Sequence, residues 1–268
     1  MSGLAHLLLD MGFNVSGSDL WENAELRQLR KRGATFSLGH AAEQLHIDLP
    51  VLVVYSSAIR LDNPELALAN RLDIPIVRRA VLLSALTSSI RVICVAGMHG
   101  KTTTTAMLAY TLEKLGNDVG FAVGAGVPQL GRHARMTFSE NAFFALETDE
   151  SDGTLREFHP EQSIVLNIDE EHLDYYENFE AVCDEFLAFG KQTSGRLIYC
   201  VDDPLLPDLY AEKPDSISYG FNPTADYQAE ITGSKKFIVR YCQKPLGEFR
   251  ICLFGEKNIS NAVAVVAF

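Results

Sequence analysis

The chain has 268 residues, of which 47% are hydrophobic and 22% charged. This is the composition of a globular protein long enough to bury a substantial core. Acidic residues outnumber basic ones by 35 to 23, which gives a net charge of −12, so we expect no nucleic-acid partner and no anionic membrane surface as a partner. A local site for a small phosphorylated ligand stays compatible with this charge.

The cysteines and the apolar segments indicate the cellular location of the protein. The five cysteines are odd in number and none forms a C-x-x-C pair, which predicts reduced thiols and a cytoplasmic location. No apolar stretch reaches the ~18 residues of a membrane span. The N-terminus also lacks a signal-peptide pattern, so we expect no membrane insertion.

Short apolar strands alternate with helical patterns over the first 88 residues. A helix is expected at 2–11, with Gly12 as its C-cap. Further strands are expected at 14–17, 51–55 and 74–77, and further helices at 22–32 and 64–71. This alternation predicts a parallel α/β layer. A small polar segment at 86–89 marks the boundary, so we expect a Rossmann-like N-terminal domain at 1–88.

The remaining residues, 89–268, repeat this alternation and then change style. We expect strands at 91–96, 143–146, 163–167 and 196–201, and helices at 101–115 and 178–189. Short alternating segments follow at 225–233, 236–242 and 247–254, before a helix from about residue 257. The fold class predicted is α/β, with a P-loop-type parallel-sheet domain that carries a small antiparallel meander.

Both ends of the chain resemble cut ends. A doubly wound domain starts with a strand that feeds its first helix, and none precedes 2–11. The apolar helical run at 261–268 stops without a terminator. We therefore expect a piece of a longer protein that lacks a first strand and everything after residue 268.

The strongest chemical signal is a glycine-containing loop between an apolar strand and a helix, in the run Val95–Thr105. Glycines let backbone N–H groups turn towards phosphate oxygens, and the helix N-terminus adds its dipole. Lys101 is expected to neutralise nucleotide phosphates, and the Thr102 hydroxyl to hold Mg²⁺. The alternative is a tight turn with an incidental lysine. His99 is either a plain loop residue or a catalytic one.

An acidic run, Glu147–Asp152, follows the strand expected at 143–146. Ligands of open α/β sheets lie at the carboxyl ends of strands, and Mg²⁺ on nucleotide phosphates usually takes one or two carboxylates. Glu147 is nearest the strand end and is the ligand we expect. A solvated acidic turn, with Asp152 as a helix cap, is the alternative for some of these residues.

Three further strand ends carry polar side chains. His172 lies among carboxylates in the run Asn167–Asp174, where it either binds a second metal or has a structural role. Asp19 ends the run Ser16–Asp19, a position that often meets a ribose or base in a Rossmann-like unit. The hydroxyls of Ser56 and Ser57 follow the strand at 51–55. Each of these signals is weak alone.

Together these segments resemble the Mur ligase family, which adds amino acids to the peptidoglycan precursor. The loop Gly97-Met-His-Gly-Lys-Thr-Thr-Thr104 is similar to that family's G-T-x-G-K-T-T-T. The other matching segments are Met1–Ala5, Ser16–Asp19, Ser56–Ile59, Asp149–Asp152, Asn167–Asp174 and Gly255–Ala262. The resemblance covers the whole chain.

The resemblance implies a role for each matching position. Lys101, Glu147 and His172 are the catalytic residues, and Thr102, Glu147 and His172 hold Mg²⁺. The ATP phosphates are implied to contact Gly97, Met98, His99, Gly100, Lys101, Thr102 and Thr103, while Asn258 and Asn261 approach the adenine. Substrate is implied to contact Ser2, Gly3, Asp19, Ser56, Ser57, Asp149, Ser151 and Asp152.

The implied activity is ATP-dependent amide formation between L-alanine and UDP-N-acetylmuramate, through an acyl phosphate, in peptidoglycan synthesis. The missing lysine in 175–190 is expected for the alanine-adding member, because several relatives use a carbamylated lysine there. Met98 replaces a usual Thr, and Lys257 replaces a usual His at a nucleotide contact. Two alternatives remain: a ligase that recycles murein tripeptide, and a nucleotide-binding module without turnover, which we favour for the isolated 268 residues.

Overall fold

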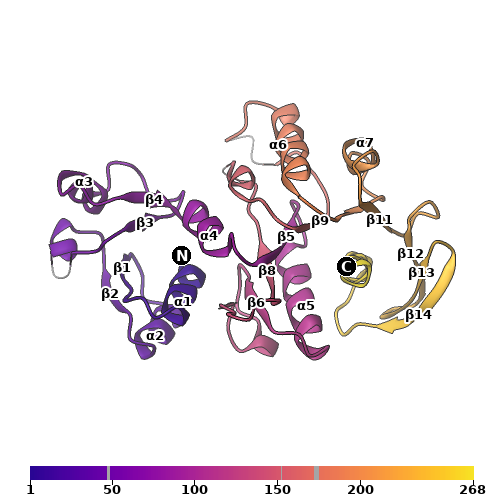
Figure 1. Cartoon of the computed structure of the whole chain (residues 1–268), viewed down its shortest axis with the longest axis horizontal. Coiled ribbons are helices and arrows are strands. Elements are labelled where there is room, and N and C mark those ends of the chain that lie inside the picture. The colour runs from indigo at the N-terminus through magenta and orange to yellow at the C-terminus, as the bar shows by residue number, and fades with distance from the viewer. Residues whose placement is uncertain (47–48, 152, 172–174) are drawn as a thin grey trace. The chain divides into compact units, whose positions relative to one another are not determined.

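The computed structural model describes residues 1–46, 49–151, 153–171 and 175–268. The chain forms two compact units (Figure 1). Met1–Thr87 and Ala134–Met136 make the first unit, and Ser88–His133 with Thr137–Phe268 make the second.

The first unit contains two separate pairs of parallel strands. β1 pairs with β2, and β3 pairs with β4. In chain order its elements are α1 (Ser2–Asp10), β1 (Ser16–Asp19), α2 (Ala24–Lys31), β2 (Thr35–Leu38), η1 (Ala42–His46), β3 (Val53–Tyr55), α3 (Pro64–Arg71), β4 (Ile76–Arg78), α4 (Arg79–Thr87) and β7 (Ala134–Arg135). A helix joins the strands of each pair, α2 between β1 and β2 and α3 between β3 and β4, as is usual for parallel pairing.

Local sequence signals explain where the helices of this unit begin. Asn23 caps α2 by accepting a hydrogen bond from the Leu26 N–H, at 2.9 Å. Asn63 caps α3 in the same way, and Pro64 fills the first helical position, where its missing N–H costs nothing.

The second unit is built on one large sheet. Its strands follow the order β14-β13-β12-β11-β10-β9-β5-β8-β6. They are parallel from β6 to β12 and antiparallel between β12, β13 and β14. The bounds are β5 (Arg91–Ala96), β6 (Val119–Ala122), β8 (Phe143–Glu147), β9 (Gln162–Val165), β10 (Leu197–Cys200), β11 (Ser216–Gly220), β12 (Tyr227–Gly233), β13 (Lys236–Tyr241) and β14 (Lys244–Arg250).

Helices cover both faces of this sheet (Figure 1). α5 (Lys101–Lys114) and α8 (Glu256–Ala267) pack against each other on one face, and α6 (Phe179–Gln192) and α7 (Leu206–Tyr210) lie on the other. Two short 3₁₀ helices, η2 (Pro128–Leu130) and η3 (Thr154–Glu157), lie in the connections. The middle of β5 is completely buried from Ile93 to Ala96, as expected for a central parallel strand.

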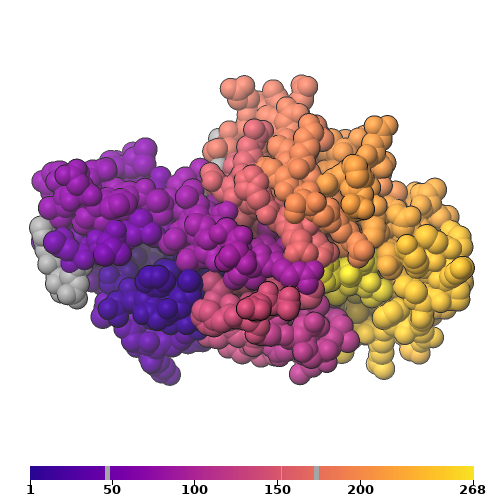
Figure 2. Space-filling view, in the orientation of Figure 1, coloured from indigo at the N-terminus to yellow at the C-terminus, as the bar shows by residue number. Residues whose placement is uncertain are grey.

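The α/β class, the parallel sheet and the antiparallel meander predicted from the sequence are confirmed. The bounds of some strands differ from those expected. The strand expected at 14–17 is β1 at Ser16–Asp19, and the strand expected at 247–254 is β14 at Lys244–Arg250. The second shift arises because Cys242 and Gln243 form a two-residue turn with positive φ angles of 45° and 68°, an unusual choice for residues other than Asn and Gly. The strands of this hairpin lie at the surface of the second unit (Figure 2).

All five cysteines are free thiols. Within the ranges that the structure describes, no helix combines the length and the apolar character that a membrane crossing demands.

Candidate functional site

The loop that joins β5 to α5 has the geometry of a phosphate-binding turn. β5 ends at Ala96 and α5 begins at Lys101. Gly97 and Gly100 have φ angles of 132° and 89°, which side chains other than hydrogen rarely allow. Gly100 caps α5 without a side-chain hydrogen bond. The first N–H groups of α5 have no intrahelical acceptors, which is the arrangement that binds anions at helix N-termini.

Asn167 holds this loop in place. Its Oδ1 accepts a hydrogen bond from the His99 N–H at 2.8 Å, and its Nδ2 donates to the His99 carbonyl at 2.9 Å. A Cβ at Gly97 would lie 3.0 Å from the Asn167 backbone nitrogen. Gly97 is thus required by its φ angle and also by the close approach of Asn167, in the segment that follows β9.

Lys101 is held at the start of α5 by a buried carboxylate. Its Nζ donates to the Gly97 carbonyl at 2.7 Å and to Glu150 Oε1 at 2.6 Å. The Glu150 side chain is fully buried, and that of Lys101 is 15% exposed. Burial raises the pKa of Glu150, and the Lys101 ammonium opposes that rise.

Thr102 and Glu147 meet beside this lysine. The Thr102 hydroxyl donates to Glu147 Oε1 at 2.8 Å, and the Gly124 N–H donates to Glu147 Oε2 at 2.5 Å. A Cβ at Gly124 would lie 2.9 Å from Glu147 Oε1. A hydroxyl and a carboxylate side by side at a phosphate loop are the hard oxygen donors that Mg²⁺ prefers, so this pair fits the ion.

The acidic run divides between solvent and core. Asp149 is exposed and accepts a hydrogen bond from the Ser151 N–H at 3.0 Å, which closes a small turn. Glu150 points inward, and the Tyr176 hydroxyl donates to its carbonyl at 2.5 Å. The turn therefore sends the neighbouring acids Asp149 and Glu150 in opposite directions. Asp152 and His172, both predicted as site residues, lie outside the described residues.

The side chain of His99 is 45% exposed. Its Nε2 lies 3.7 Å from Asp169 Oδ2 and 3.5 Å from Glu171 Oε1. These acids belong to the run that follows β9. The backbone of His99, rather than its ring, makes the contacts with Asn167 that shape the loop.

The two asparagines of α8 have different surroundings. Asn261 is buried against the phosphate loop: a Cβ at Gly100 would lie 2.8 Å from its Oδ1. Asn258 donates from Nδ2 to the Phe254 carbonyl at 2.7 Å, next to the start of its own helix. Lys257 is exposed in the first turn of α8.

In the first unit, the predicted substrate residues lie at element ends. Ser2 and Gly3 open α1, and Ser56 and Ser57 follow β3. Asp19 ends β1, and its Oδ1 accepts a hydrogen bond from the Trp21 N–H at 3.2 Å.

A polar cluster that the sequence analysis missed lies beside Asp19. The Ser18 hydroxyl donates to Glu65 Oε1 at 2.6 Å and lies 2.8 Å from His40 Nδ1. This cluster links the end of β1 to the first turn of α3. Ser18 is 22 positions from His40 and 47 from Glu65 in the sequence, so no local pattern predicts that the three side chains meet.

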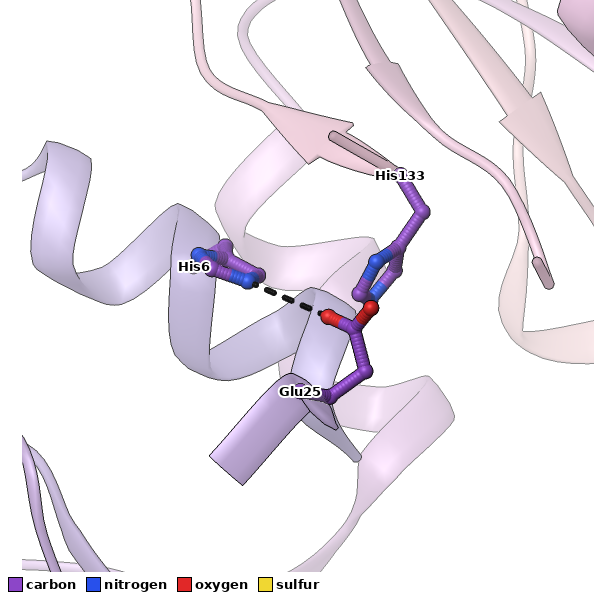
Figure 3. Close-up of side chains that lie close together, drawn as sticks. All are labelled: His6, Glu25 and His133. Atoms are coloured by element: carbon purple, nitrogen blue, oxygen red, sulfur yellow. Dashed lines mark ion pairs between the residues drawn. The ribbon is translucent and has the colours of Figure 1, made fainter. Parts of the chain in front are cut away.

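A second cluster in this unit ties α1 to α2. His6 is buried, and its Nε2 lies 3.6 Å from Glu25 Oε2, an ion pair if the ring is protonated (Figure 3). Arg32 donates to Asp10 Oδ1 at 2.6 Å and lies 2.7 Å from His6 Nδ1. These contacts join the two helices through polar groups.

Three residues of the second-unit site were also missed: Gly124, Glu150 and Asn167. Glu150 lies in the acidic run that the sequence singled out, and Asn167 opens the run that contains His172. Their motifs were recognised, but not their contacts with the loop. Nothing in the sequence marks Gly124, because its role depends on the packing of β6 beside β8.

Two family models match the chain. The Mur ligase middle domain matches residues 95–268, and the model described as the Mur ligase family catalytic domain matches residues 1–91.

Curated relatives with the name UDP-N-acetylmuramate–L-alanine ligase match over the full chain. The proteins from an Anaeromyxobacter species and from Myxococcus xanthus are both 40% identical to it. The match covers 100% of this chain but 59% and 57% of these relatives. The chain therefore spans less than two thirds of their length.

Solved structures give the same picture. The UDP-N-acetylmuramate:L-alanyl-γ-D-glutamyl-meso-diaminopimelate ligase of Neisseria meningitides matches with a TM-score of 0.91 and 26% identity, over 100% of this chain and 88% of that one. The UDP-N-acetylmuramate–alanine ligase of Thermotoga maritima matches with a TM-score of 0.88 and 27% identity, over 100% and 61%.

Proposed function

Because the chain belongs to the Mur ligase family, we propose that it forms the nucleotide-binding and UDP-sugar-binding parts of a ligase that joins L-alanine to UDP-N-acetylmuramate. The observation that carries this proposal is the meeting of Thr102 and Glu147 beside Lys101, at the loop after β5. The names of the relatives that are 40% identical support L-alanine as the acceptor.

We assign the two substrates to the two domains predicted from the sequence. Residues 1–88 bind the UDP-sugar, and residues 89–268 bind ATP. Ser2, Gly3, Asp19, Ser56 and Ser57 contact the UDP-sugar, and Asn258 and Asn261 approach the adenine. Asp149, Ser151 and Asp152 complete the substrate contacts. The enzyme works in the cytoplasm, in peptidoglycan synthesis.

The chemistry we propose proceeds through an acyl phosphate. A carboxylate oxygen of UDP-N-acetylmuramate attacks the γ-phosphorus of ATP, and ADP leaves with the electrons of the broken P–O bond. The amine of L-alanine then attacks the acyl carbon, and inorganic phosphate leaves as the amide forms. Lys101 and the N-terminus of α5 stabilise the charge on the phosphates, so catalysis rests on positioning and electrostatics.

Thr102 and Glu147 would hold Mg²⁺, and His172 would join Glu147 at a second ion; the metal would neutralise phosphate charge and orient the nucleotide. Lys101 and Glu147 are the described residues that we assign as catalytic. Gly97, Met98, His99, Gly100 and Thr103 contribute mainly through the backbone. Met98 in place of a threonine is therefore compatible with phosphate binding.

Binding of the two proposed ligands to this chain tests the proposal. Calorimetry is expected to give saturable binding of Mg·ATP and, independently, of UDP-N-acetylmuramate. An Asp19→Asn variant is expected to weaken UDP-N-acetylmuramate binding and to leave Mg·ATP binding unchanged. Absence of UDP-N-acetylmuramate binding by the folded chain would reject the substrate assignment.

A second candidate acceptor is supported by one observation. The Neisseria structure, a ligase for L-alanyl-γ-D-glutamyl-meso-diaminopimelate, matches with a TM-score of 0.91 over the whole chain. Phosphate release in the ligase that contains this chain separates the two. Release that depends on L-alanine supports our proposal, whereas release that depends on the tripeptide supports the alternative.

A further inference from the structure

Glu150 is a buried carboxylate at the phosphate loop that the proposed mechanism leaves without a role. Its side chain is fully buried, and its Oε1 lies 2.6 Å from Lys101 Nζ. A carboxylate at this distance from an ammonium makes a strong charge-assisted hydrogen bond. The lysine that is expected to bind phosphate is thus already paired with an anion.

The donors of Lys101 are directed at protein acceptors. An ammonium has three N–H donors, and Nζ contacts the Gly97 carbonyl at 2.7 Å, the Met98 carbonyl at 3.4 Å and Glu150 Oε1 at 2.6 Å. The two carbonyls belong to the loop and carry no net charge. Glu150 carries the same sign of charge as a nucleotide phosphate, so the two anions compete for one cation.

The position of Glu150 is fixed by neighbours that do not belong to the phosphate loop. The Tyr176 hydroxyl donates to the Glu150 carbonyl at 2.5 Å, and the Thr154 hydroxyl donates to the Asp149 carbonyl at 3.0 Å. These two contacts hold the backbone of the turn, and from it the Glu150 carboxylate points to Lys101 Nζ, 2.6 Å away. A competitor that is already in place lowers affinity for the ligand that has to replace it.

We propose that Glu150 is an internal competitor of nucleotide phosphate: its carboxylate neutralises Lys101 in the nucleotide-free chain, and phosphate oxygens replace it on binding. Glu150 then sets the affinity for nucleotides whose phosphates reach Lys101. This inference rests on the proposed ATP-binding role of the loop.

The Glu150→Gln variant tests the proposal, because it keeps an acceptor oxygen at nearly the same place and removes the charge. We expect it to bind ATP and ADP about three- to tenfold more tightly than the unmodified chain, as measured by calorimetry. AMP lacks the β- and γ-phosphates that Lys101 is expected to bind, so its affinity is expected to stay unchanged. Glu180→Gln removes the same charge from an exposed position on α6 and is expected to change none of these affinities.

Unchanged or weaker ATP binding by folded Glu150→Gln would overturn the proposal, and so would an equal gain for AMP. Should the variant fail to fold, Tyr176→Phe decides, because it loosens Glu150 without removing a buried charge. It is expected to tighten ATP binding in the same direction, and weaker or unchanged binding would contradict the proposal. If the unmodified chain itself does not bind ATP, the proposed function fails instead, so the two failures can be told apart.

Discussion

The side chains that define the candidate site come from separate strands and are brought together by the order of those strands. Lys101 and Thr102 follow β5, and Glu147 ends β8, the neighbour of β5 in the sheet. Because parallel strands place their carboxyl ends at one edge, the sequence was sufficient to predict that these residues share a site. Asn167 positions the loop, and Gly124 positions Glu147. Both depend on contacts between residues far apart in the sequence, so no sequence pattern predicts them.

The first residue-scale prediction concerns Gly124. Its Gly124→Ala variant places a methyl group 2.9 Å from Glu147 Oε1, where no real Cβ fits, so the carboxylate has to move. We expect Mg²⁺-dependent ATP affinity to fall about 10- to 100-fold, the range seen when a ligand's supporting hydrogen bonds are disturbed. Calorimetry with and without Mg²⁺ measures this.

The matched control is Gly126→Ala, because a Cβ at Gly126 meets nothing within 4 Å. Its Mg·ATP affinity is expected to equal that of the unmodified chain. Equal losses in both variants would show that the effect comes from the loop backbone and not from Glu147.

The second residue-scale prediction concerns Asn167. Asn167→Ala removes both hydrogen bonds to the backbone of His99, so the loop loses its fixed geometry, and ATP affinity is expected to fall by about tenfold. Asn178→Ala removes the cap of α6 and provides the control. Loss of this cap is expected to lower the free energy of unfolding by ~1 kcal/mol and to leave ATP affinity unchanged. Equal ATP affinity in both variants would contradict a positioning role for Asn167.

At the scale of elements, the central strand β5 and the long helix α5 were the most predictable features, whereas α4 and α7 were not predicted. β5 coincides with the strand expected at 91–96, and α5 ends one residue before the end expected at 115. Long periodic or fully apolar segments carry their own signal. β2, β6, β7 and β11 were not predicted, because polar residues or glycine interrupt the apolar residues of each.

The hairpin between β13 and β14 provides a prediction at this scale. Cys242 and Gln243 have positive φ angles of 45° and 68°, a conformation that costs a residue with a side chain about 1 kcal/mol or more. Replacing the pair by Asn-Gly is therefore expected to raise the free energy of unfolding by about 1 kcal/mol, measured by urea denaturation. Gln243→Val is expected to lower it, since a β-branched side chain resists this conformation. A gain in stability from Gln243→Val would contradict the assigned turn geometry.

At the scale of the whole molecule, the charge of the chain and the charge of its proposed ligand have the same sign. The net charge is −12, yet ATP is an anion, so binding has to come from local groups: Lys101, the backbone of 97–103 and the N-terminus of α5. A local motif and an overall composition therefore predict different things: the lysine and the glycines predict an anion site, while the composition predicts a chain that carries a net negative charge.

The assignment of the β5–α5 loop as the phosphate site is tested by calorimetric titration of Mg·ATP into the 268-residue chain and into its Lys101→Ala variant. Lys114→Ala removes the same charge from the other end of α5 and is the matched control. We predict saturable binding by the unmodified chain and by Lys114→Ala, and a loss of at least about tenfold in Lys101→Ala. Equal Mg·ATP affinity in Lys101→Ala and the unmodified chain, with both proteins folded, would contradict the assignment of this loop as the phosphate site.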